Sequence, residues 1–534
     1  MKAAIINMSI APSYLLTRGH VVTMDEKNSV HEAILLRQGR VAWVGASAAA
    51  PAADRVIDLK GGTVLPGLTD AHLHLLAQAQ ESLQVRLDLP DVVTLADVIE
   101  RLRVRAAEAA PDEWIVAAGY DEALIREGRL PSADDLDAAV PDRPVLVRRF
   151  GGHLAIANTL AMRLAGIETD TPDPPGGVYE RKNGRLTGVL KEMAAEHIYT
   201  VAPRPSATRL SERMRKIALD YLRLGVTAVC EAGVGFTNGF DDEWTVWRQI
   251  QREGGFPLRL ALMLRLDPEE ARRRGFQPGP VDPDWQVRTL KFFADGIVGA
   301  RTAVFSEPYD DGPGRGAYIT SPEAMRHLFG LAHQDGWQIA VHTIGDTAIA
   351  ETVASLELAS GGARCAHRHR IEHLGFPHRQ ILPRLRKAGI SVVTQYAFLD
   401  KMGDSFIRAL GPVRGGAMYP GRSLIEAGIV VAGSSDSPTG PSSPFRAMAS
   451  AITRRTGAGI VVAAGETLAR TDAVRIYTWG GAYCTHQESF RGALKPGYLA
   501  DLGVYDADIF TAAVETIADT RARMTFVRGE PILW

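Results

Sequence analysis

Residues 67–74 read GLTDAHLH and directly follow the apolar run TVLP at residues 63–66. This stretch places two histidines, His72 and His74, at the end of a strand-like segment. Side chains at positions i and i+2 of a strand point to the same side, so both imidazoles can reach one point in space. Two converging imidazoles suit a divalent metal ion, whereas a lone His-x-His pair more often belongs to a loop that faces solvent.

Four later segments repeat this form, because each is an apolar strand-like run that carries a potential metal ligand. In a parallel α/β barrel the carboxyl ends of all strands open onto one face, where the active site is built. The candidate ligands therefore form one connected set at that face rather than isolated surface positions. They are His72, His74, Lys291, His342, His373 and Asp436.

Strand-like runs alternate with helical patterns along the middle of the chain, which predicts an α/β fold with a (β/α)8 TIM-type barrel. Between the first two runs lie about 150 residues, whereas a βα unit needs only about 30–40. We therefore expect an insertion over roughly 83–205, which starts on the catalytic face and serves as a lid that selects substrates. The predicted barrel strands are 63–66 with the metal-binding tip after it, 226–230, 258–266, 288–294, 338–342, 368–373, 390–395 and 429–433.

Both ends of the chain carry short β-rich runs separated by turns. Each end alone is too small to bury the face of a sheet. We therefore expect residues 1–66 and 490–534 to form one composite β-sandwich. Residues 67–489 then make up the barrel with its inserted subdomain.

The composition is typical of a soluble globular enzyme, with 46% hydrophobic and 23% charged residues in a chain of 534. The formal net charge is −2 without long charged runs, so nucleic acid is not an expected partner. Three scattered cysteines argue for a reducing, cytoplasmic location. No apolar run approaches the roughly 20 residues of a membrane span. We expect a small molecule as substrate, and homodimerisation stays open.

These motifs resemble the amidohydrolase superfamily over nearly the whole chain. Residues 61–74 are similar to that superfamily's first barrel strand. The runs KFFADGIVGARTA at 291–303, VHTIGD at 341–346 and RIEH at 370–373 are similar to its YtcJ-like branch, the third amidohydrolase family, which includes N-substituted formamide deformylases. The resemblance implies the barrel, the composite sandwich and metal-dependent hydrolysis of a carbon–nitrogen bond.

The resemblance also implies how the ligands are shared. His72 and His74 would hold one divalent metal with Asp436, and His342 and His373 would hold another. Lys291 would bridge the two ions after its amine has reacted with carbon dioxide to form an N6-carboxylated side chain. The alternative is an unmodified lysine that pairs with Asp295. One or two ions fit this set; zinc is the default, and iron, manganese and nickel stay open.

Cys230 offers a second candidate for the bridging position. It ends the second predicted strand, and D-aminoacylase-like relatives use a cysteine there as a metal ligand. In that case Cys230 would displace Lys291 from the bridge. A buried cysteine is more often just a small apolar side chain.

The predicted chemistry is attack by a metal-activated hydroxide on a carbonyl carbon. Asp436 would act as general base and pass the proton to the departing nitrogen. The substrate would be amide-like: an N-substituted formamide, an N-acyl amine, a carbamate or a cyclic amide. The alternatives are an esterase or lactonase with the same centre, and a non-catalytic metal-binding protein, which would not need Asp436.

Four further residues are candidates around the centre. His153 resembles a position where a histidine near the substrate polarises the scissile carbonyl, with a surface-loop histidine as the alternative. Arg301 would hold a carboxylate or an acyl oxygen, or else fix its own loop through a salt bridge. Tyr396 stands where relatives often have proline and is predicted to line the pocket. Asp70 is predicted to orient a ligand histidine.

Overall fold

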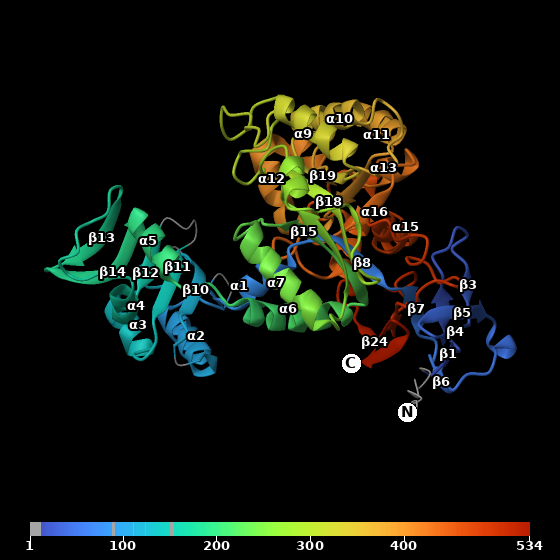
Figure 1. Ribbon diagram of the computed structural model, residues 1–534, viewed down its shortest axis with the longest axis horizontal. Coiled ribbons are helices and arrows are strands. Elements are labelled where there is room, and N and C mark those ends of the chain that lie inside the picture. The colour runs from blue at the N-terminus through green and yellow to red at the C-terminus, as the bar shows by residue number, and fades with distance from the viewer. Residues whose placement is uncertain (1–11, 88–90, 111, 123, 150–153) are drawn as a thin grey trace, which may run out of the picture. The chain divides into compact units, whose positions relative to one another are not determined.

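A computed structural model describes residues 12–87, 91–110, 112–122, 124–149 and 154–534 (Figure 1). The chain divides into two compact units. The barrel unit comprises Met1–Leu75 and Ser211–Trp534, and the inserted unit comprises Leu76–Leu210. The inserted unit thus begins and ends a few residues outside the predicted limits of 83 and 205.

The barrel unit is built on eight parallel strands of the described residues, paired in chain order. The chain is an α/β protein with a nearly closed parallel barrel, as the sequence predicts. A short strand, β17 (Gly279–Pro280), adds antiparallel pairing to β18. The barrel strands are β8 (Leu68–Leu73), β15 (Val226–Val234), β16 (Arg259–Leu264), β18 (Trp285–Phe293), β19 (Gln338–Thr343), β20 (Arg370–His373), β21 (Ser391–Thr394) and β22 (Val431–Gly433).

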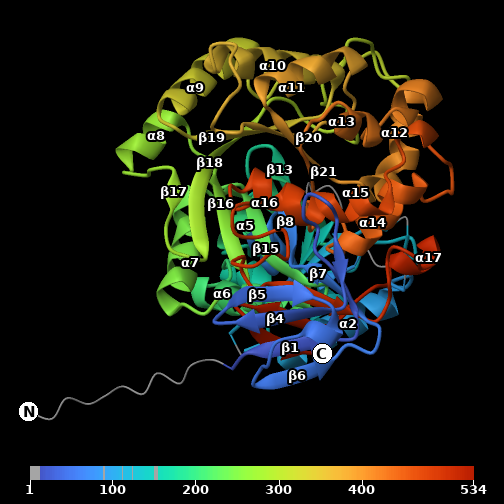
Figure 2. The same cartoon turned by 90° about the vertical axis from the view of Figure 1, so that its right-hand side faces the viewer.

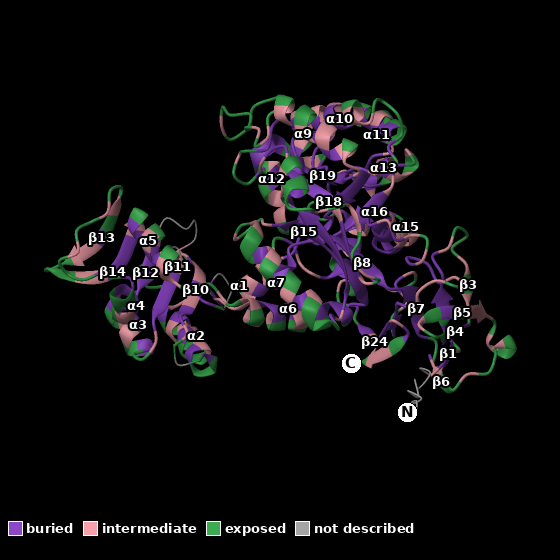
Figure 3. Cartoon of the chain, viewed as in Figure 1, coloured by how far each residue is buried: buried purple, intermediate pink, exposed green. Residues whose placement is uncertain are grey.

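Helices surround these strands, and Figure 2 shows α9, α10 and α11 outside β18–β20. Strands covered on both faces are apolar throughout; every residue of β15 is buried (Figure 3). No helix of the described residues is long and apolar enough to span a membrane. The helices are α1 (Leu75–Ser82), α6 (Ala207–Leu222), α7 (Phe240–Glu253), α8 (Pro268–Arg273), α9 (Pro322–Gln334), α10 (Asp346–Ala359), α11 (Leu382–Ala388), α12 (Ala397–Gly416), α13 (Arg422–Glu426), α14 (Pro444–Thr453), α15 (Arg470–Arg475), α16 (Gly481–Cys484) and α17 (Val514–Ile517), with short helical turns η1 (Ser47–Ala49), η2 (Arg379–Ile381), η3 (Ala464–Glu466) and η4 (Ile476–Gly480).

Two small sheets from both chain ends accompany the barrel, and they share one apolar cluster. The first has the order β5-β4-β1-β6, and the second has the order β25-β24-β23-β7-β2-β3. Their strands are β1 (Tyr14–Thr17), β2 (His20–Val22), β3 (Val30–His31), β4 (Ala33–Arg37), β5 (Arg40–Gly45), β6 (Arg55–Asp58), β7 (Thr63–Pro66), β23 (Leu502–Tyr505), β24 (Ala522–Val527) and β25 (Glu530–Leu533).

The first barrel strand differs from the prediction. Residues 63–66 form β7, which pairs with β23 in a small sheet, and the barrel strand β8 starts only at Leu68. Gly67 separates the two strands. A Cβ atom at Gly67 would lie 2.2 Å from Oγ1 of Thr227, so only glycine lets the chain pass β15 there.

Backbone hydrogen bonds draw the two end strands of the barrel together. The N–H of Asp436 donates to the carbonyl of His72, and the N–H of His74 donates to the carbonyl of Ser437, each at 2.8 Å. The loop after β22 is thereby fixed against the end of β8. This contact brings a carboxylate and two imidazoles together.

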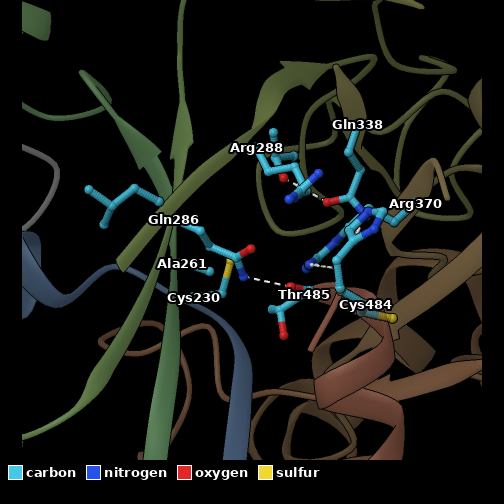
Figure 4. Close-up of a pocket in the computed structure, with 11 residues that line it drawn as sticks. Cys230, Ala261, Gln286, Arg288, Gln338, Arg370, Cys484 and Thr485 are labelled. Atoms are coloured by element: carbon cyan, nitrogen blue, oxygen red, sulfur yellow. Dashed lines mark hydrogen bonds between the residues drawn. The ribbon is translucent and has the colours of Figure 1, made fainter. Parts of the chain in front are cut away.

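A polar pocket lies at the amino-terminal end of the barrel interior, away from the strand tips (Figure 4). It is lined by Cys230, Gln286, Arg288, Gln338 and other residues of the lower barrel. Cys230 packs there in a cluster with small and apolar side chains. The thiol therefore belongs to the lower core.

The inserted unit is a mixed sheet with the order β13-β14-β12-β11-β10-β9. One apolar cluster includes residues of α2 and α3, and another includes residues of α4 and α5. His153 lies outside the described residues. The elements are β9 (Val85–Arg86), α2 (Leu95–Glu108), β10 (Ile115–Tyr120), α3 (Ala133–Ala139), β11 (Val145–Arg149), β12 (Leu154–Ala157), α4 (Thr159–Leu164), β13 (Gly177–Lys182), β14 (Arg185–Glu192) and α5 (Met193–Val201).

Candidate metal centre

The strand ends bring a compact group of nitrogen and oxygen donors together. His72 lies in β8, and His74 follows that strand directly. Both Nε2 atoms lie 3.3 Å from the same oxygen, Oδ1 of Asp436. One ligand atom from each residue lies within 4.8 Å of the other two. Zinc ligands at about 2.0–2.1 Å from the ion in tetrahedral geometry lie about 3.4 Å apart, so this spacing fits one shared cation.

A buried ion pair fixes the tautomer of His72. Arg370 and Glu372, two apart on β20, form a salt bridge with no solvent exposure. Glu372 also bonds Nδ1 of His72. Because an ionised carboxylate only accepts, Nδ1 of His72 carries the proton and Nε2 carries a lone pair. That lone pair faces a carboxylate oxygen of Asp436, and only a proton or a metal cation between them makes the contact favourable.

The substitution Glu372→Gln tests this arrangement. A neutral amide at this position would leave the Arg370 cation without its partner and would no longer enforce the His72 tautomer. We expect metal affinity to fall about 10- to 100-fold, the usual cost of losing a carboxylate behind a ligand histidine. Competition with a chelator of known affinity measures this change. Unchanged affinity would show that Glu372 does not prepare His72 for metal.

His342 and His373 carry the other predicted ligand pair, and their ring centroids lie 4.5 Å apart. Nδ1 of His373 lies 2.7 Å from Oε1 of Gln395, whose amide nitrogen donates to Ser434. The Gln395 oxygen thus accepts from Nδ1, and Nε2 of His373 keeps its lone pair. Nε2 of His342 donates to the carbonyl of Gly296 at 3.1 Å, so Nδ1 keeps its lone pair. The His373 ring also lies 5.1 Å from that of His72, so the two pairs adjoin.

Two residues of the site have left-handed backbone conformations, His373 with φ 71° and Asp436 with φ 52°. Neighbouring residues of a regular strand face opposite sides. The turn at His373 breaks this alternation, so Glu372 and His373 both contribute to one site. Such conformations cost about 1–3 kcal/mol and concentrate at functional sites.

The carboxylates beside His74 favour a positive charge at that point of the site. Burial alone would lower the pKa of His74, but the nearby carboxylates of Asp436 and Glu231 raise it to about 9. Although burial opposes ionisation of Asp436, its contacts with His72 and His74 hold its pKa well below the ordinary value. Burial lowers the pKa of His342 to about 3, which keeps that ring neutral. The carboxylates that hold a proton here would hold a metal cation in the same way.

Lys291 projects from β18 into the same region and is almost fully buried. Its Nζ has no hydrogen-bond partner among the described residues and lies 4.9 Å from the ring centroid of Phe293. Asp295 does not pair with it, because three backbone N–H groups after β18 and β19 occupy that carboxylate. Burial lowers the pKa of Lys291 to about 8. The alternative of a Lys291–Asp295 ion pair is thus absent. When the Lys291 amine is neutral, it keeps an unused lone pair.

The structure does not bring Cys230 into this group. Burial raises the pKa of its thiol to about 12. It packs in an apolar cluster of the lower barrel, where it also lines the polar pocket. The metal-binding role considered for Cys230 therefore stays a prediction without a contact to support it.

Two predicted substrate-binding residues have structural contacts instead. The guanidinium of Arg301 pairs with Asp311 and donates to carbonyls of its own loop. Tyr396 is fully buried, and its hydroxyl donates to the carbonyl of Pro420. These contacts do not offer either group to a ligand. Substrate binding by both residues, and by His153 outside the described residues, stays a prediction.

Asp70 connects two parts of the site. Its Oδ1 accepts from the N–H of His72 at 3.3 Å and from the N–H of Ser435 at 3.0 Å. These bonds position the backbone on both sides of the centre. Burial raises the pKa of Asp70 to about 7.

Residues 55–533 match the sequence profile of the amidohydrolase family. The chain belongs to this family. The Bacillus subtilis protein YtcJ is 28% identical over 96% of this chain and 98% of its own length. The N-substituted formamide deformylase of Arthrobacter pascens is 28% identical over 96% of this chain and 97% of its own length. The solved structure of an uncharacterized metal-dependent hydrolase from Pyrococcus furiosus has the same fold, with a TM-score of 0.76, 24% identity, and coverage of 93% of this chain and all of that one. The protein is a metal-dependent amidohydrolase.

Sequence reasoning missed the carboxylates that contact the candidate ligands of this amidohydrolase. Glu372 stands beside His373 in the quoted motif, and its i+2 spacing from Arg370 was the available signal. Glu231 gives a weaker signal. Its Oε2 accepts from the N–H of Leu75 at 2.9 Å, and its Oε1 lies 3.7 Å from Nδ1 of His74.

A second histidine–cysteine group of the amidohydrolase lies outside this centre and comprises His333, Cys365 and His369. Nδ1 of His369 accepts from the N–H of Ile339 at 3.1 Å, so the ring proton is on Nε2. That proton points at Nδ1 of His333, 3.0 Å away. The lone pairs that a metal would need are thus occupied, and the group is a hydrogen-bonded chain.

The buried His369 in this hydrogen-bonded group makes the stability of the protein depend on pH. Burial, with repulsion from His333 and His367, lowers the pKa of His369 to about 3, below the value of about 6.5 for an unfolded histidine. Between these values the unfolded chain binds one proton more. The free energy of unfolding therefore falls with decreasing pH, by up to about 1.4 kcal/mol per unit. Urea titrations at several pH values measure how the free energy of unfolding changes with pH. This dependence should be weaker in His369→Gln and unchanged in His20→Gln, whose histidine is exposed. Identical slopes for all three proteins would refute this assignment.

Proposed function

We propose that this enzyme hydrolyses N-substituted formamides or related N-acyl amines at a zinc centre held by the strand-end ligands. The contact between Nε2 of His72 and Oδ1 of Asp436, with His74 on the same oxygen, carries this proposal. The deformylase among the relatives supports the choice of substrate class. The six proposed ligands are His72, His74, Lys291, His342, His373 and Asp436.

The residues present fit a divalent metal. Imidazole nitrogens and carboxylate oxygens are ligands that zinc accepts. In His72 and His373, Nδ1 bonds a protein side chain and Nε2 keeps the lone pair that a metal needs. When bound, the metal would polarise the substrate carbonyl and lower the pKa of a water molecule toward 7.

Asp436 would move the proton in this reaction. Its carboxylate would accept a proton from the attacking water as the new carbon–oxygen bond forms. It would return that proton to the nitrogen as the carbon–nitrogen bond breaks. A formamide then gives formate and an amine. The low pKa of Asp436 keeps the carboxylate in its accepting form before the reaction.

Lys291 would act as an anionic ligand after carboxylation. The neutral amine attacks the carbon of carbon dioxide, a nitrogen–carbon bond forms, and one proton leaves to give the carbamate. The buried, unpartnered Nζ and the pKa near 8 support this step, because a neutral amine is the reactive form. An unmodified lysine would place an uncompensated positive charge beside the ligands.

A matched pair of substrates tests the proposal. N-Phenethylformamide and phenethyl formate differ only in the atom that leaves, nitrogen or oxygen. The zinc-loaded enzyme should release formate from the amide with a higher kcat/KM than expected from the intrinsic reactivity of the two compounds. Hydrolysis of the ester alone would support the esterase alternative and overturn the amide assignment.

A further inference from the structure

One wall beside the candidate metal centre is aromatic. Phe236 stacks on His74 with ring centroids 4.9 Å apart, and Phe293 stacks on Phe236 at 5.5 Å. Phe293 also lies 5.3 Å from His342. The wall therefore runs from a ligand histidine of one predicted pair to a ligand histidine of the other. Any substrate carbonyl near these ligands brings its substituent close to this wall.

Phe236 is held in place although its side chain is 43% exposed. The buried carboxylate of Glu243 accepts from three backbone N–H groups of the loop around it, those of Gly235, Thr237 and Asn238. The N–H of Phe236 itself donates to the carbonyl of Gly233. An exposed phenyl ring on a loop fixed by four hydrogen bonds is a preorganised apolar contact surface.

Arg265 lies over this wall. It follows β16 at the carboxyl end of the barrel, and its guanidinium carbon is 5.7 Å from the ring centroid of Phe236 and 5.4 Å from that of Phe293. One nitrogen makes a long bond of 3.4 Å to the carbonyl of Phe236. No carboxylate of the described residues pairs with Arg265, whereas Arg259 and Arg301 both have acidic partners.

We infer that Phe236, Phe293 and Arg265 select amides whose substituent carries both an apolar group and a carboxylate. This inference rests on the proposed function and names the substrate class of the same site. The phenyl rings would contact the apolar part of the substrate. Arg265 would bind the carboxylate through the N–H groups that no described residue uses.

The chemistry of a guanidinium on aromatic rings supports an anionic group rather than a neutral one. Stacking satisfies the faces of the planar cation and leaves its edge, where the N–H donors lie, open to a two-oxygen acceptor. Arginine matches a carboxylate with two parallel hydrogen bonds. A cation that served only to brace the wall would not need an open edge.

Two formamides that differ only in the carboxylate test this inference, namely N-formylphenylalanine and N-phenethylformamide. The enzyme should prefer the acid by about tenfold or more in kcat/KM, the effect of one charge-assisted contact at a partly exposed site. Arg265→Gln should remove the preference by raising KM for N-formylphenylalanine while kcat stays the same, because the contact is already made in the bound substrate. Arg265→Lys should keep part of it. Arg252→Gln, on the exposed face of α7, is the matched control and should keep all of it.

Binding without turnover separates this inference from the proposed function. In an Asp436→Asn background, calorimetry should show N-formylphenylalanine binding about tenfold more weakly once Arg265 is also replaced by glutamine. Such a loss supports the inference even if no formamide is hydrolysed, which would overturn only the proposed function. An Arg265→Gln variant that keeps the preference and the affinity would overturn the inference, as would an equal loss for both formamides.

Discussion

Asp436→Asn is expected to keep most of its bound metal while kcat falls about 10²–10⁴-fold, the range for loss of a general acid–base group. Asparagine has nearly the same shape and keeps an oxygen at the position that faces His72 and His74. Its amide cannot take a proton from water at neutral pH. The variant thus separates proton transfer from metal binding.

Steady-state kinetics and elemental analysis of the same preparation measure both quantities. Turnover close to that of the unchanged enzyme would remove Asp436 from the proton path. Loss of metal in parallel with activity would make Asp436 chiefly a ligand, and the proton acceptor would have to be sought elsewhere.

Lys291→Ala is expected to lower kcat/KM by about 10³-fold or more, because a bridging anionic ligand disappears from the centre. Bicarbonate together with a short-chain carboxylic acid should restore part of the activity, since a small carboxylate can occupy the space of the missing carbamate. Both effects follow from a buried amine without a protein partner among the described residues.

Cys230→Ala is the matched control for this experiment. Its side chain packs against small apolar residues of the lower barrel, so the variant should keep metal and activity within a few fold. The reverse pattern, with a mild Lys291→Ala and an inactive Cys230→Ala, would move the bridging role to the cysteine.

The barrel and the convergence of the candidate ligands at one face were predictable because parallel strands align their carboxyl ends. An apolar run followed by a polar residue thus reports a point on one face, and His72, His342 and Asp436 all follow this rule. The first strand escaped the prediction because residues 63–66 form the apolar run, whereas the barrel strand at 68–73, LTDAHL, alternates apolar and polar residues and was taken as the tip after the strand. Only the close approach of Gly67 to Thr227 separates the sheet strand from the barrel strand.

The supporting carboxylates and the aromatic wall were harder to predict. Glu372 and His373 are neighbours, and strand alternation puts one of them outside the site; the left-handed backbone at His373 overrides this rule and leaves no sequence signature. Phe236 depends on Glu243, whose role is visible only when the loop folds over it. Arg301 and Tyr396 have attractive positions in sequence, but their polar atoms bond to protein groups.

The metal content of the purified enzyme tests the central claim most directly. After expression in metal-supplemented medium, elemental analysis should find about one to two equivalents of divalent metal per chain, retained through dialysis because the donors converge at one face of the barrel. Less than about a tenth of an equivalent under the same conditions would contradict a metal centre at these strand ends.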